Sequence, residues 1–281
     1  MILKKYILFL LAMSDTEKST SFLGHLEELR WRLVKSAIAI VVVAVTVFIF
    51  IEPLTDIVLM SMSRSGFPTY KFMCFVSQSL GLGDAMCAGN VAVKTIETQM
   101  TKQFATSIYF SIVSGIIISF PFLAFQIWSF VKPGLKKKEI KATRGIVWYA
   151  TFLFLLGVGF GYFVISPLCI QFFGFYKMSD NIELMPTFTS YYSLIVSSTI
   201  ACGLFFQLPI VVYIMAKLGI MTPEVLKKYR KHALVGILVL SAVITPPDFI
   251  SQVIVAIPVF MLYEISIVIC RRVVKNQRVN A

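Results

Sequence analysis

A single acidic side chain among clustered cations is the first candidate for chemistry in this sequence. Glu139 lies between two apolar runs. Its segment also carries Lys132, Lys136, Lys137, Lys138, Lys141 and Arg144. A carboxylate binds a guanidinium through two parallel hydrogen bonds, so Glu139 is a candidate receptor for an arginine-bearing ligand. The alternative is that Glu139 only relieves charge repulsion in a solvated loop.

A second group of charged residues lies on a predicted helix over residues 22–35. Its apolar stripe comprises Phe22, Leu26, Leu29 and Leu33. Its polar stripe comprises His25, Glu28, Arg32 and Lys35. This pattern predicts an amphipathic helix at a membrane surface. On the pattern alone, Glu28 is best explained as the i, i+4 partner of Arg32, a pair worth about 0.2–0.5 kcal/mol.

Two polar side chains lie inside apolar runs, where polar groups are costly and indicate function by default. Gln207 lies in Phe-Phe-Gln-Leu-Pro and is either a functional contact or a hydrogen-bonding group between helices. Glu264 lies in Leu-Tyr-Glu-Ile-Ser near the end of the last run, where it either reaches the surface or pairs with a basic residue.

Catalytic and metal-binding patterns are absent from the sequence. It contains two His and five Cys, with no His-Glu-x-x-His, Gly-x-Ser-x-Gly, Cys-x-x-Cys or glycine-rich phosphate loop. Gly157, Gly159 and Gly161 lie within an apolar run, which favours close helix packing over nucleotide binding. We therefore expect no enzyme, no cofactor and no metal.

The composition shows the environment in which these residues lie. Of the 281 residues 58% are hydrophobic and 14% charged, whereas soluble domains average about 45–50% and about 25%. Six apolar runs occur at about 33–51, 104–126, 146–173, 190–217, 233–245 and 249–270. Because a membrane helix needs about 20 such residues, the sequence predicts an all-α, polytopic membrane protein with six transmembrane helices.

The cations are distributed unequally between the two sides of this topology. Only five of the 26 lie on one side, namely Arg64, Lys71, Lys94, Lys102 and Lys177. The positive-inside rule therefore predicts that both termini are cytoplasmic, and it explains the net charge of +12 without nucleic acid binding. We divide the chain into an N-terminal segment (1–21), a membrane domain (22–273) and a basic cytoplasmic tail (274–281).

Prolines and span lengths predict a curved, cupped bundle. The apolar runs are ended or interrupted by five prolines, Pro53, Pro121, Pro167, Pro209 and Pro258. Each proline removes a backbone donor. The fifth run is about 20 Å of helix, against a hydrocarbon core of about 30 Å. A tight turn is predicted at Pro246, Pro247 and Asp248. Spans five and six are therefore expected to be short, in a locally thinned bilayer or beside partner proteins.

Two segments leave alternatives open. Residues 1–12 are either an upstream over-extension of the start or a surface-lying appendage. Cys74 and Cys87 share the one long outer loop, where they either form a disulfide or remain two thiols.

Four motifs occur together in the order found in one known family. They are His25–Arg30, Trp128–Leu135 followed by Lys138-Glu139, Phe206–Pro209, and Thr245–Asp248. With six spans and cytoplasmic ends, they resemble TatC, the six-span signal-receptor subunit of the twin-arginine protein translocase, from about residue 20 onwards. The resemblance implies a receptor in the bacterial cytoplasmic (inner) membrane. It would bind Arg-Arg signal peptides of folded proteins and organise their export by the proton-motive force.

The resemblance also implies roles for particular residues. The matching signal-peptide site comprises Glu28, Leu29, Arg30, Phe130 and Glu139. Single-span TatA- and TatB-type subunits are implied to contact the spans near Gln207 and Pro209, with Glu264 as a further intramembrane polar group. Other copies of the chain and the lipid bilayer are the remaining expected partners. Many members of that family carry Glu where this chain has Gln207. Because glutamine does not titrate, this chain has no titratable group at that position.

The alternative function is a secondary transporter of a small solute. Such carriers show paired repeats, broken helices and polar residues near the midplane of the membrane. This sequence has no obvious repeat, and only Gln207 is predicted near the midplane. An intramembrane hydrolase is a third class, and the sequence offers no nucleophile–base pair for it.

Overall fold

A computed structural model of the chain describes residues 22–64, 66–79, 95–132, 145–175, 185–244 and 249–279. In these ranges the secondary structure is helical, apart from an isolated parallel β-bridge between Ile96 and Thr187. The predicted all-α class is therefore confirmed for the described part of the chain. The predictions for residues 1–21, Cys87, Glu139 and the turn at Pro246, Pro247 and Asp248 lie outside it.

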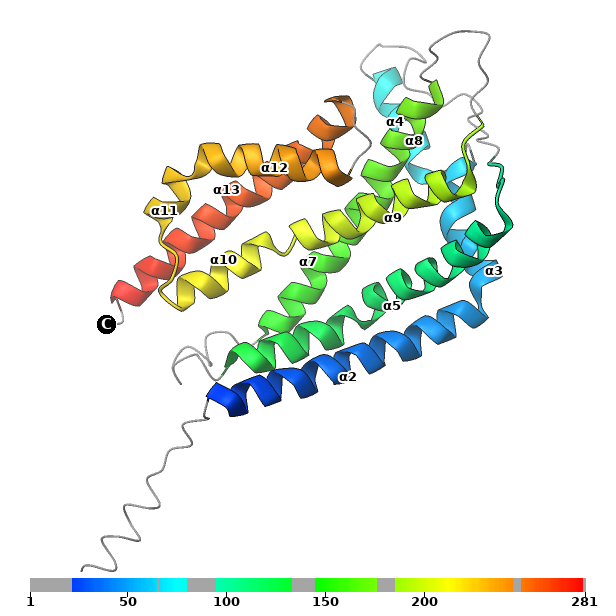
Figure 1. Ribbon diagram of the computed structural model, residues 1–281. Helices are drawn as coiled ribbons and strands as arrows, with labels where there is room; N and C mark the ends of the chain where they lie inside the picture. Colours follow the sequence, from blue (N-terminus) through cyan, green and yellow to red (C-terminus); the bar gives the residue numbers. More distant parts are fainter. Residues whose placement is uncertain are drawn as a thin grey trace, which may run out of the picture.

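Five long helical stretches make up most of the molecule (Figure 1). The long helices and their continuations are α2 (Phe22–Ile49), α5 (Met100–Val131), α7 (Ile146–Phe160) with η4 (Gly161–Ile165) and α8 (Ser166–Phe175), α9 (Phe188–Phe205) with α10 (Leu208–Lys217), and α13 (Phe249–Val279). The shorter elements are α3 (Ile51–Leu54), η1 (Thr55–Leu59), η2 (Met60–Ser63), α4 (Pro68–Ser79), α11 (Pro223–Lys228) and α12 (Arg230–Ile244).

The long helices lie side by side. In Figure 1, α2 runs along α5 at one edge of the molecule, and α12 and α13 lie at the opposite edge, with α7, α9 and α10 between them. One end of the bundle, here named the Glu28 end, holds the start of α2 and the ends of α5, α10 and α13. The opposite end, named the Glu97 end, holds the starts of α5 and α9.

Four helical stretches are long and apolar enough to cross a membrane, among the residues the structure describes. They are Glu27–Ile49, Met100–Val131, Ile146–Gly174 and Phe188–Lys217, and they match the first four predicted spans. The short fifth helix is also present, because the 15 residues of α12 rise only about 22 Å. The count of six spans stays a prediction.

The helix that contains the sixth predicted span is longer than its apolar run. The helix α13 has 31 residues, because it continues beyond the apolar run through Arg271, Arg272 and Lys275. The short length of the span itself stays a prediction, because helical backbone does not stop where its side chains become polar.

The prolines affect the helices unequally. Pro121 and Pro258 lie inside continuous helices, and Pro53 lies within α3. Pro167 directly follows the start of α8 after a π-helical stretch, and Pro209 follows the turn that separates α9 from α10. A proline has no N–H for the preceding helical turn, which explains why the chain breaks beside Pro209.

Small residues allow the central helices to approach closely. A Cβ atom added to Gly157 would lie 2.7 Å from the Cys202 carbonyl oxygen. A Cβ atom added to Gly161 would lie 2.7 Å from the Cα atom of Thr199. Both glycines therefore permit the contact of α7 and η4 with α9, as predicted. A Cβ atom added to Gly159 would meet no atom within 4 Å, so the predicted packing role was wrong for that residue.

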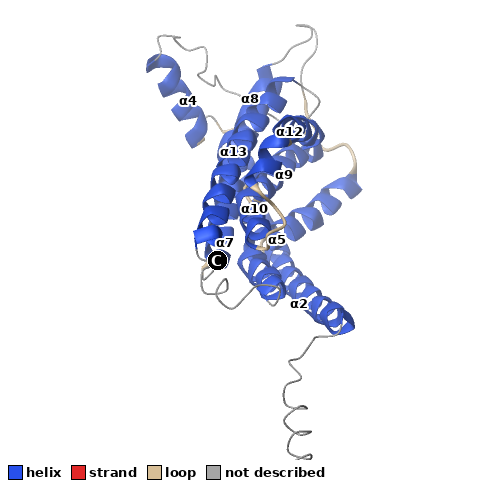
Figure 2. Ribbon diagram, turned by 90° about the vertical axis from the view of Figure 1, so that its left-hand side faces the viewer, coloured by secondary structure: helices blue, strands red, loops and turns tan. Residues whose placement is uncertain are grey.

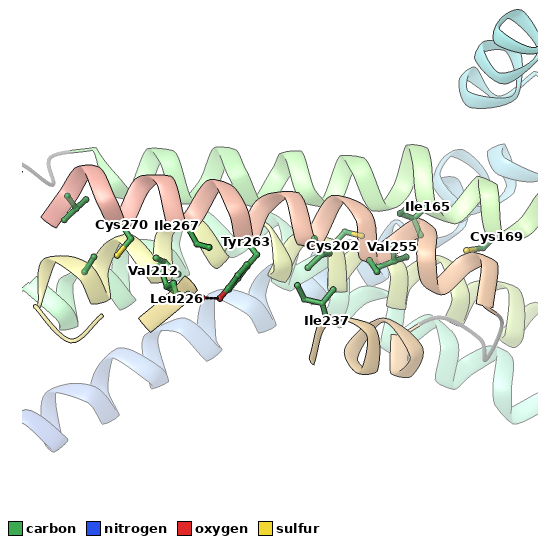
Figure 3. Close-up of a cluster of buried hydrophobic side chains, with 14 residues drawn as sticks. Ile165, Cys169, Cys202, Val212, Leu226, Ile237, Val255, Tyr263, Ile267 and Cys270 are labelled. Carbon is green, nitrogen blue, oxygen red and sulfur yellow. Dashed lines mark hydrogen bonds between the residues drawn. The ribbon is translucent and has the colours of Figure 1, made fainter. Parts of the chain in front are cut away.

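Two clusters of buried apolar side chains hold the bundle together. In the first, α13 packs along α10, and Figure 3 shows Ile267 of α13 near Val212 of α10. The second joins α2, η1, η2, α5 and α9, and its members include Leu59, Met62, Phe110 and Tyr192. Outside these clusters the helices expose large apolar side chains, as a lipid solvent requires.

Candidate functional site

A guanidinium–carboxylate pair lies at the Glu28 end, about two and three turns into α2. Arg32 donates from Nε to Oε1 of Glu28 at 3.1 Å, and from Nη2 to the same oxygen. The side chain of Arg32 is 20% exposed and that of Glu28 is 37% exposed. The carboxylate is therefore the more accessible partner, and the i, i+4 pairing that the pattern favoured is confirmed.

Arg32 also connects α2 with α5. Its Nη1 atom lies 3.5 Å from the carbonyl oxygen of Gln126, one turn before Phe130 on α5. Further along the same interface, the hydroxyl of Ser119 donates to the carbonyl of Ala39 at 3.4 Å. The packing of α2 on α5 thus brings Glu28 to the end of α5 on which the half-buried Phe130 lies.

The remaining predicted members of this site are placed only in part. Leu29 is half-buried and Arg30 is exposed, both beside Glu28 on α2. Glu139 lies seven residues beyond Lys132, the last described residue of the α5 stretch, so the proximity of Glu28 to Glu139 stays a prediction. The site that the structure describes comprises Glu28, Leu29, Arg30, Arg32 and Phe130, here named the α2–α5 site.

Gln207 makes a hydrogen bond between helices. It lies in the turn between α9 and α10, and its Nε2 donates to the carbonyl of Ala150 on α7 at 3.1 Å. Its own carbonyl accepts from the backbone N–H groups of Ile210 and Val211, and Pro209 beside it is buried. Gln207 thus links the turn between α9 and α10 to α7. This confirms the interpretation of Gln207 as a hydrogen-bonding group between helices.

Glu264 pairs with a basic residue of another helix. Its Oε2 atom lies 2.6 Å from Nη2 of Arg230, at the start of α12. The neighbouring Tyr263 donates its hydroxyl hydrogen to the carbonyl of Leu226 on α11 at 2.7 Å, a bond drawn in Figure 3. These contacts attach α11 and α12 to α13 at the Glu28 end.

A second carboxylate site lies at the Glu97 end, and sequence reasoning missed it. Oε2 of Glu97 accepts from the hydroxyl and the backbone N–H of Thr189, at 2.8 and 3.3 Å. Oε1 accepts from the backbone N–H groups of Thr98 and Gln99, at 3.1 and 3.4 Å. Hydrogen bonds to the charged form, that from the Thr189 hydroxyl first, lower the pKa of Glu97.

The Glu97 site joins the starts of two long helices. The backbone N–H of Ile96 donates to the carbonyl of Pro186 at 3.2 Å, and that of Phe188 donates to the carbonyl of Ile96 at 2.9 Å. Glu97 and Thr189 are 92 residues apart, so no local sequence pattern predicts their contact. The only signal for this site in the sequence is that Glu97-Thr98-Gln99 directly precedes an apolar run.

Tyrosine hydroxyls fasten the segment after α2 to the bundle. Tyr162 donates to the carbonyl of Val58 at 2.6 Å, and Tyr191 donates to the carbonyl of Leu59 at 3.0 Å. In Figure 2, α4 stands apart from α8, and the start of α4 contacts η4, where Thr69 donates to the carbonyl of Phe163. Within α4, Cys74 is disulfide-bonded, and Cys87, its partner in one of the two alternatives left open by the sequence, lies outside the described residues.

The described residues offer little for bond-making chemistry. Within the ranges given above, no three His, Cys, Asp or Glu residues gather where they could hold a metal ion. An apolar groove of about 340 Å³ lies between α5, α9 and α12, with Tyr109, Ser197 and Leu240 in its lining. What the α2–α5 site does offer is a half-exposed carboxylate for a cationic ligand.

The sequence and the fold are both similar to known proteins. The family model described as Sec-independent protein translocase protein (TatC) matches residues 24–258. A Sec-independent protein translocase protein TatC of Blattabacterium sp. subsp. Periplaneta americana is 32% identical over 94% of this chain and 100% of its own length. That of Desulforapulum autotrophicum is 37% identical over 91% of this chain and 86% of its own length.

Solved structures agree with the sequence matches. A crystal structure of the twin arginine translocase receptor TatC superposes with a TM-score of 0.70 at 30% identity, over 89% of this chain and 99% of the other. A crystal structure of the TatC receptor in DDM gives a TM-score of 0.72, also at 30% identity, over 88% and 99% of the two chains.

Proposed function

Because the chain belongs to the TatC family of Sec-independent protein translocase proteins, we propose that it is the subunit that binds twin-arginine signal peptides. The supporting observation is the half-exposed carboxylate of Glu28, held by a guanidinium at the meeting point of α2 and α5. A group that already binds one guanidinium in this geometry is suited to bind another. Membership of a protein translocase family favours a role in protein transport over a role as a transporter of a small solute. We propose no catalytic step.

The proposed signal-peptide site extends the α2–α5 site by one residue. Glu28 and Glu139 each bind one arginine of the pair, and Phe130, Leu29 and Arg30 surround them. Two contacts between a carboxylate and a planar guanidinium in partly desolvated surroundings favour Arg over Lys, because only Arg offers a two-pronged donor.

The proposed topology has six spans, with α12 and α13 as the fifth and sixth. The Glu28 end then faces the cytoplasm, with both termini, in the bacterial cytoplasmic (inner) membrane. Two observations support this: α13 packs along α10 as a long helix, and the exposed Arg271, Arg272 and Lys275 lie at its last turns. The turn at Pro246, Pro247 and Asp248 would lie on the outer side.

The proposed partners are single-span TatA- and TatB-type subunits and other copies of this chain. The exposed Leu204 and Val211 on either side of the break at Gln207 and Pro209 support a contact for a partner helix, while Gln207 itself bonds to α7. The apolar groove formed with Tyr109, Leu204 and Leu240 lies on the same helical stretch, α9. Glu264 is paired within the chain and belongs to this proposal only as a neighbouring polar group.

Crosslinking of a signal peptide tests the proposal. A synthetic Arg-Arg signal peptide with a photoreactive group beside the arginines is added to the protein in lipid nanodiscs. We expect Glu28→Gln and Glu139→Gln each to lower the crosslinking yield about tenfold or more, because each removes a charge-assisted contact. The control is Glu52→Gln, the same change at an exposed position on α3. Yields equal to wild type in both variants would contradict the site.

A further inference from the structure

Arg32 places a guanidinium of this chain on the carboxylate proposed to bind the arginine of a signal peptide. Two of its three donor nitrogens, Nε at 3.1 Å and Nη2, reach the same oxygen of Glu28. The chemistry of this contact is the chemistry of the proposed ligand contact, a guanidinium fork on a carboxylate. An incoming arginine therefore meets a carboxylate whose Oε1 atom already accepts from a guanidinium.

Arg32 has a second acceptor within reach. Its Nη1 atom lies 3.5 Å from the carbonyl oxygen of Gln126, at the end of α5. A guanidinium that leaves Glu28 can still donate to this carbonyl, so its displacement does not leave a largely buried cation without an acceptor. The geometry thus offers a low-cost route for one guanidinium to replace another.

We propose that Arg32 is a built-in competitor of the signal peptide, so that binding at Glu28 is an exchange of guanidinium groups. This inference rests on the proposed function of Glu28. In the unliganded protein Arg32 occupies one oxygen of the carboxylate and lowers the affinity for any cation. When an arginine of the signal peptide binds Glu28, Arg32 keeps its hydrogen bond to the Gln126 carbonyl of α5.

The exchange leaves the link between α2 and α5 in place. Arg32 and Glu28 both belong to α2, so the bond from Arg32 to the Gln126 carbonyl is the contact with α5. After the exchange only the pair within α2 is broken, and the contact of Arg32 with α5 remains.

The test measures equilibrium binding of a fluorescent Arg-Arg signal peptide to the full chain in nanodiscs. Arg32→Gln removes the competitor, so we expect binding about two- to tenfold tighter than wild type. Arg32→Lys keeps the charge but loses the fork, and we expect a smaller gain in affinity. Lys35→Gln removes one cation from the same helix without touching the Glu28–Arg32 pair, and we expect no more than a slight gain.

Labelling without any peptide gives an independent measurement. A water-soluble carbodiimide with an amine nucleophile should modify Glu28 faster in Arg32→Gln than in wild type. Addition of the peptide should slow the reaction in both proteins.

The outcomes separate this inference from the proposed function. Weaker or unchanged binding in Arg32→Gln, with Glu28→Gln still defective, would overturn the competitor role and make Arg32 a positioning residue or a plain helix pair. An equal gain from Arg32→Gln and Lys35→Gln would also overturn it, since general charge would then explain both. Unchanged binding in Glu28→Gln would contradict the proposed function itself.

Discussion

Two carboxylates, one at each end of the bundle, are held in opposite ways. Glu97 accepts four hydrogen bonds from the backbone and a hydroxyl of this chain, and these donors are neutral. Glu28 is held by the guanidinium of Arg32, a charged donor on a long side chain. Neutral backbone donors cannot be exchanged for a ligand without unfolding the helix starts, whereas a guanidinium can be replaced by another guanidinium. The comparison therefore separates a structural carboxylate from one that is suited to binding.

The largest expected effect comes from the same substitution at both ends. Glu28→Gln should lower the affinity for an Arg-Arg signal peptide about tenfold or more, whereas Glu97→Gln should leave it within about twofold of wild type. The thermal midpoint of Glu28→Gln should move by no more than about 1–2 °C, because a half-exposed i, i+4 pair contributes little. Peptide titration and thermal unfolding in the same nanodiscs measure both quantities. If Glu97→Gln lowered the affinity for the peptide as much as Glu28→Gln, the comparison between the two carboxylates would fail.

A second, more local effect should appear at the Glu97 end. Glu97→Gln replaces a charged acceptor of four hydrogen bonds by an amide with a single acceptor oxygen, so the starts of α5 and α9 should open more often. Hydrogen exchange should become several-fold faster at the amides of Thr98, Gln99 and Thr189 and stay unchanged in α13. Thr189→Val, which removes only the hydroxyl, should give a smaller acceleration. Unchanged exchange in both variants would show that Glu97 is not a structural clamp.

The pH dependence of the Glu97 end follows from the lowered pKa of its carboxylate. A carboxyl group whose pKa is lower in the folded than in the unfolded protein stabilises the fold above the unfolded value, here about 4.5. That stabilisation is lost as the pH falls through the folded value. The difference in thermal midpoint between wild type and Glu97→Gln should therefore be constant from pH 7 to about pH 5 and shrink below it. A difference that grew on acidification would contradict the clamp.

The two carboxylates also show what a sequence can and cannot predict. The Glu28–Arg32 pair was predictable because its members lie four residues apart on one helix, where spacing alone brings them together. The Glu97–Thr189 contact joins residues 92 positions apart and exists only once α5 and α9 have packed. Local periodicity carries no information about such a partner.

The same distinction holds for the other polar groups and for the spans. The sequence allowed Glu264 a basic partner, but only the packing of α12 on α13 selects Arg230. The acceptor of Gln207 is a backbone carbonyl, that of Ala150, which no side-chain pattern reveals. The four long spans were predictable since apolar runs report directly on a lipid solvent, whereas the true end of α13 was not, because helical structure continues into its basic residues.

The smallest expected effect concerns Gln207, which lies between the two ends and is neutral like the donors around Glu97. Its amide links the turn before α10 to the Ala150 carbonyl of α7. Gln207→Leu should cost about 0.6 kcal/mol, the average for a hydrogen bond between membrane helices, because the Ala150 carbonyl can keep its bond within the helix. Since neither partner is charged, the loss should be the same at low and high salt, unlike peptide binding at Glu28. Thermal unfolding of wild type and Gln207→Leu at two ionic strengths measures this. A loss that depends on salt would mean that a charged group contributes to this contact, and the comparison would then no longer divide the chain into a neutral framework and one exchangeable charged pair.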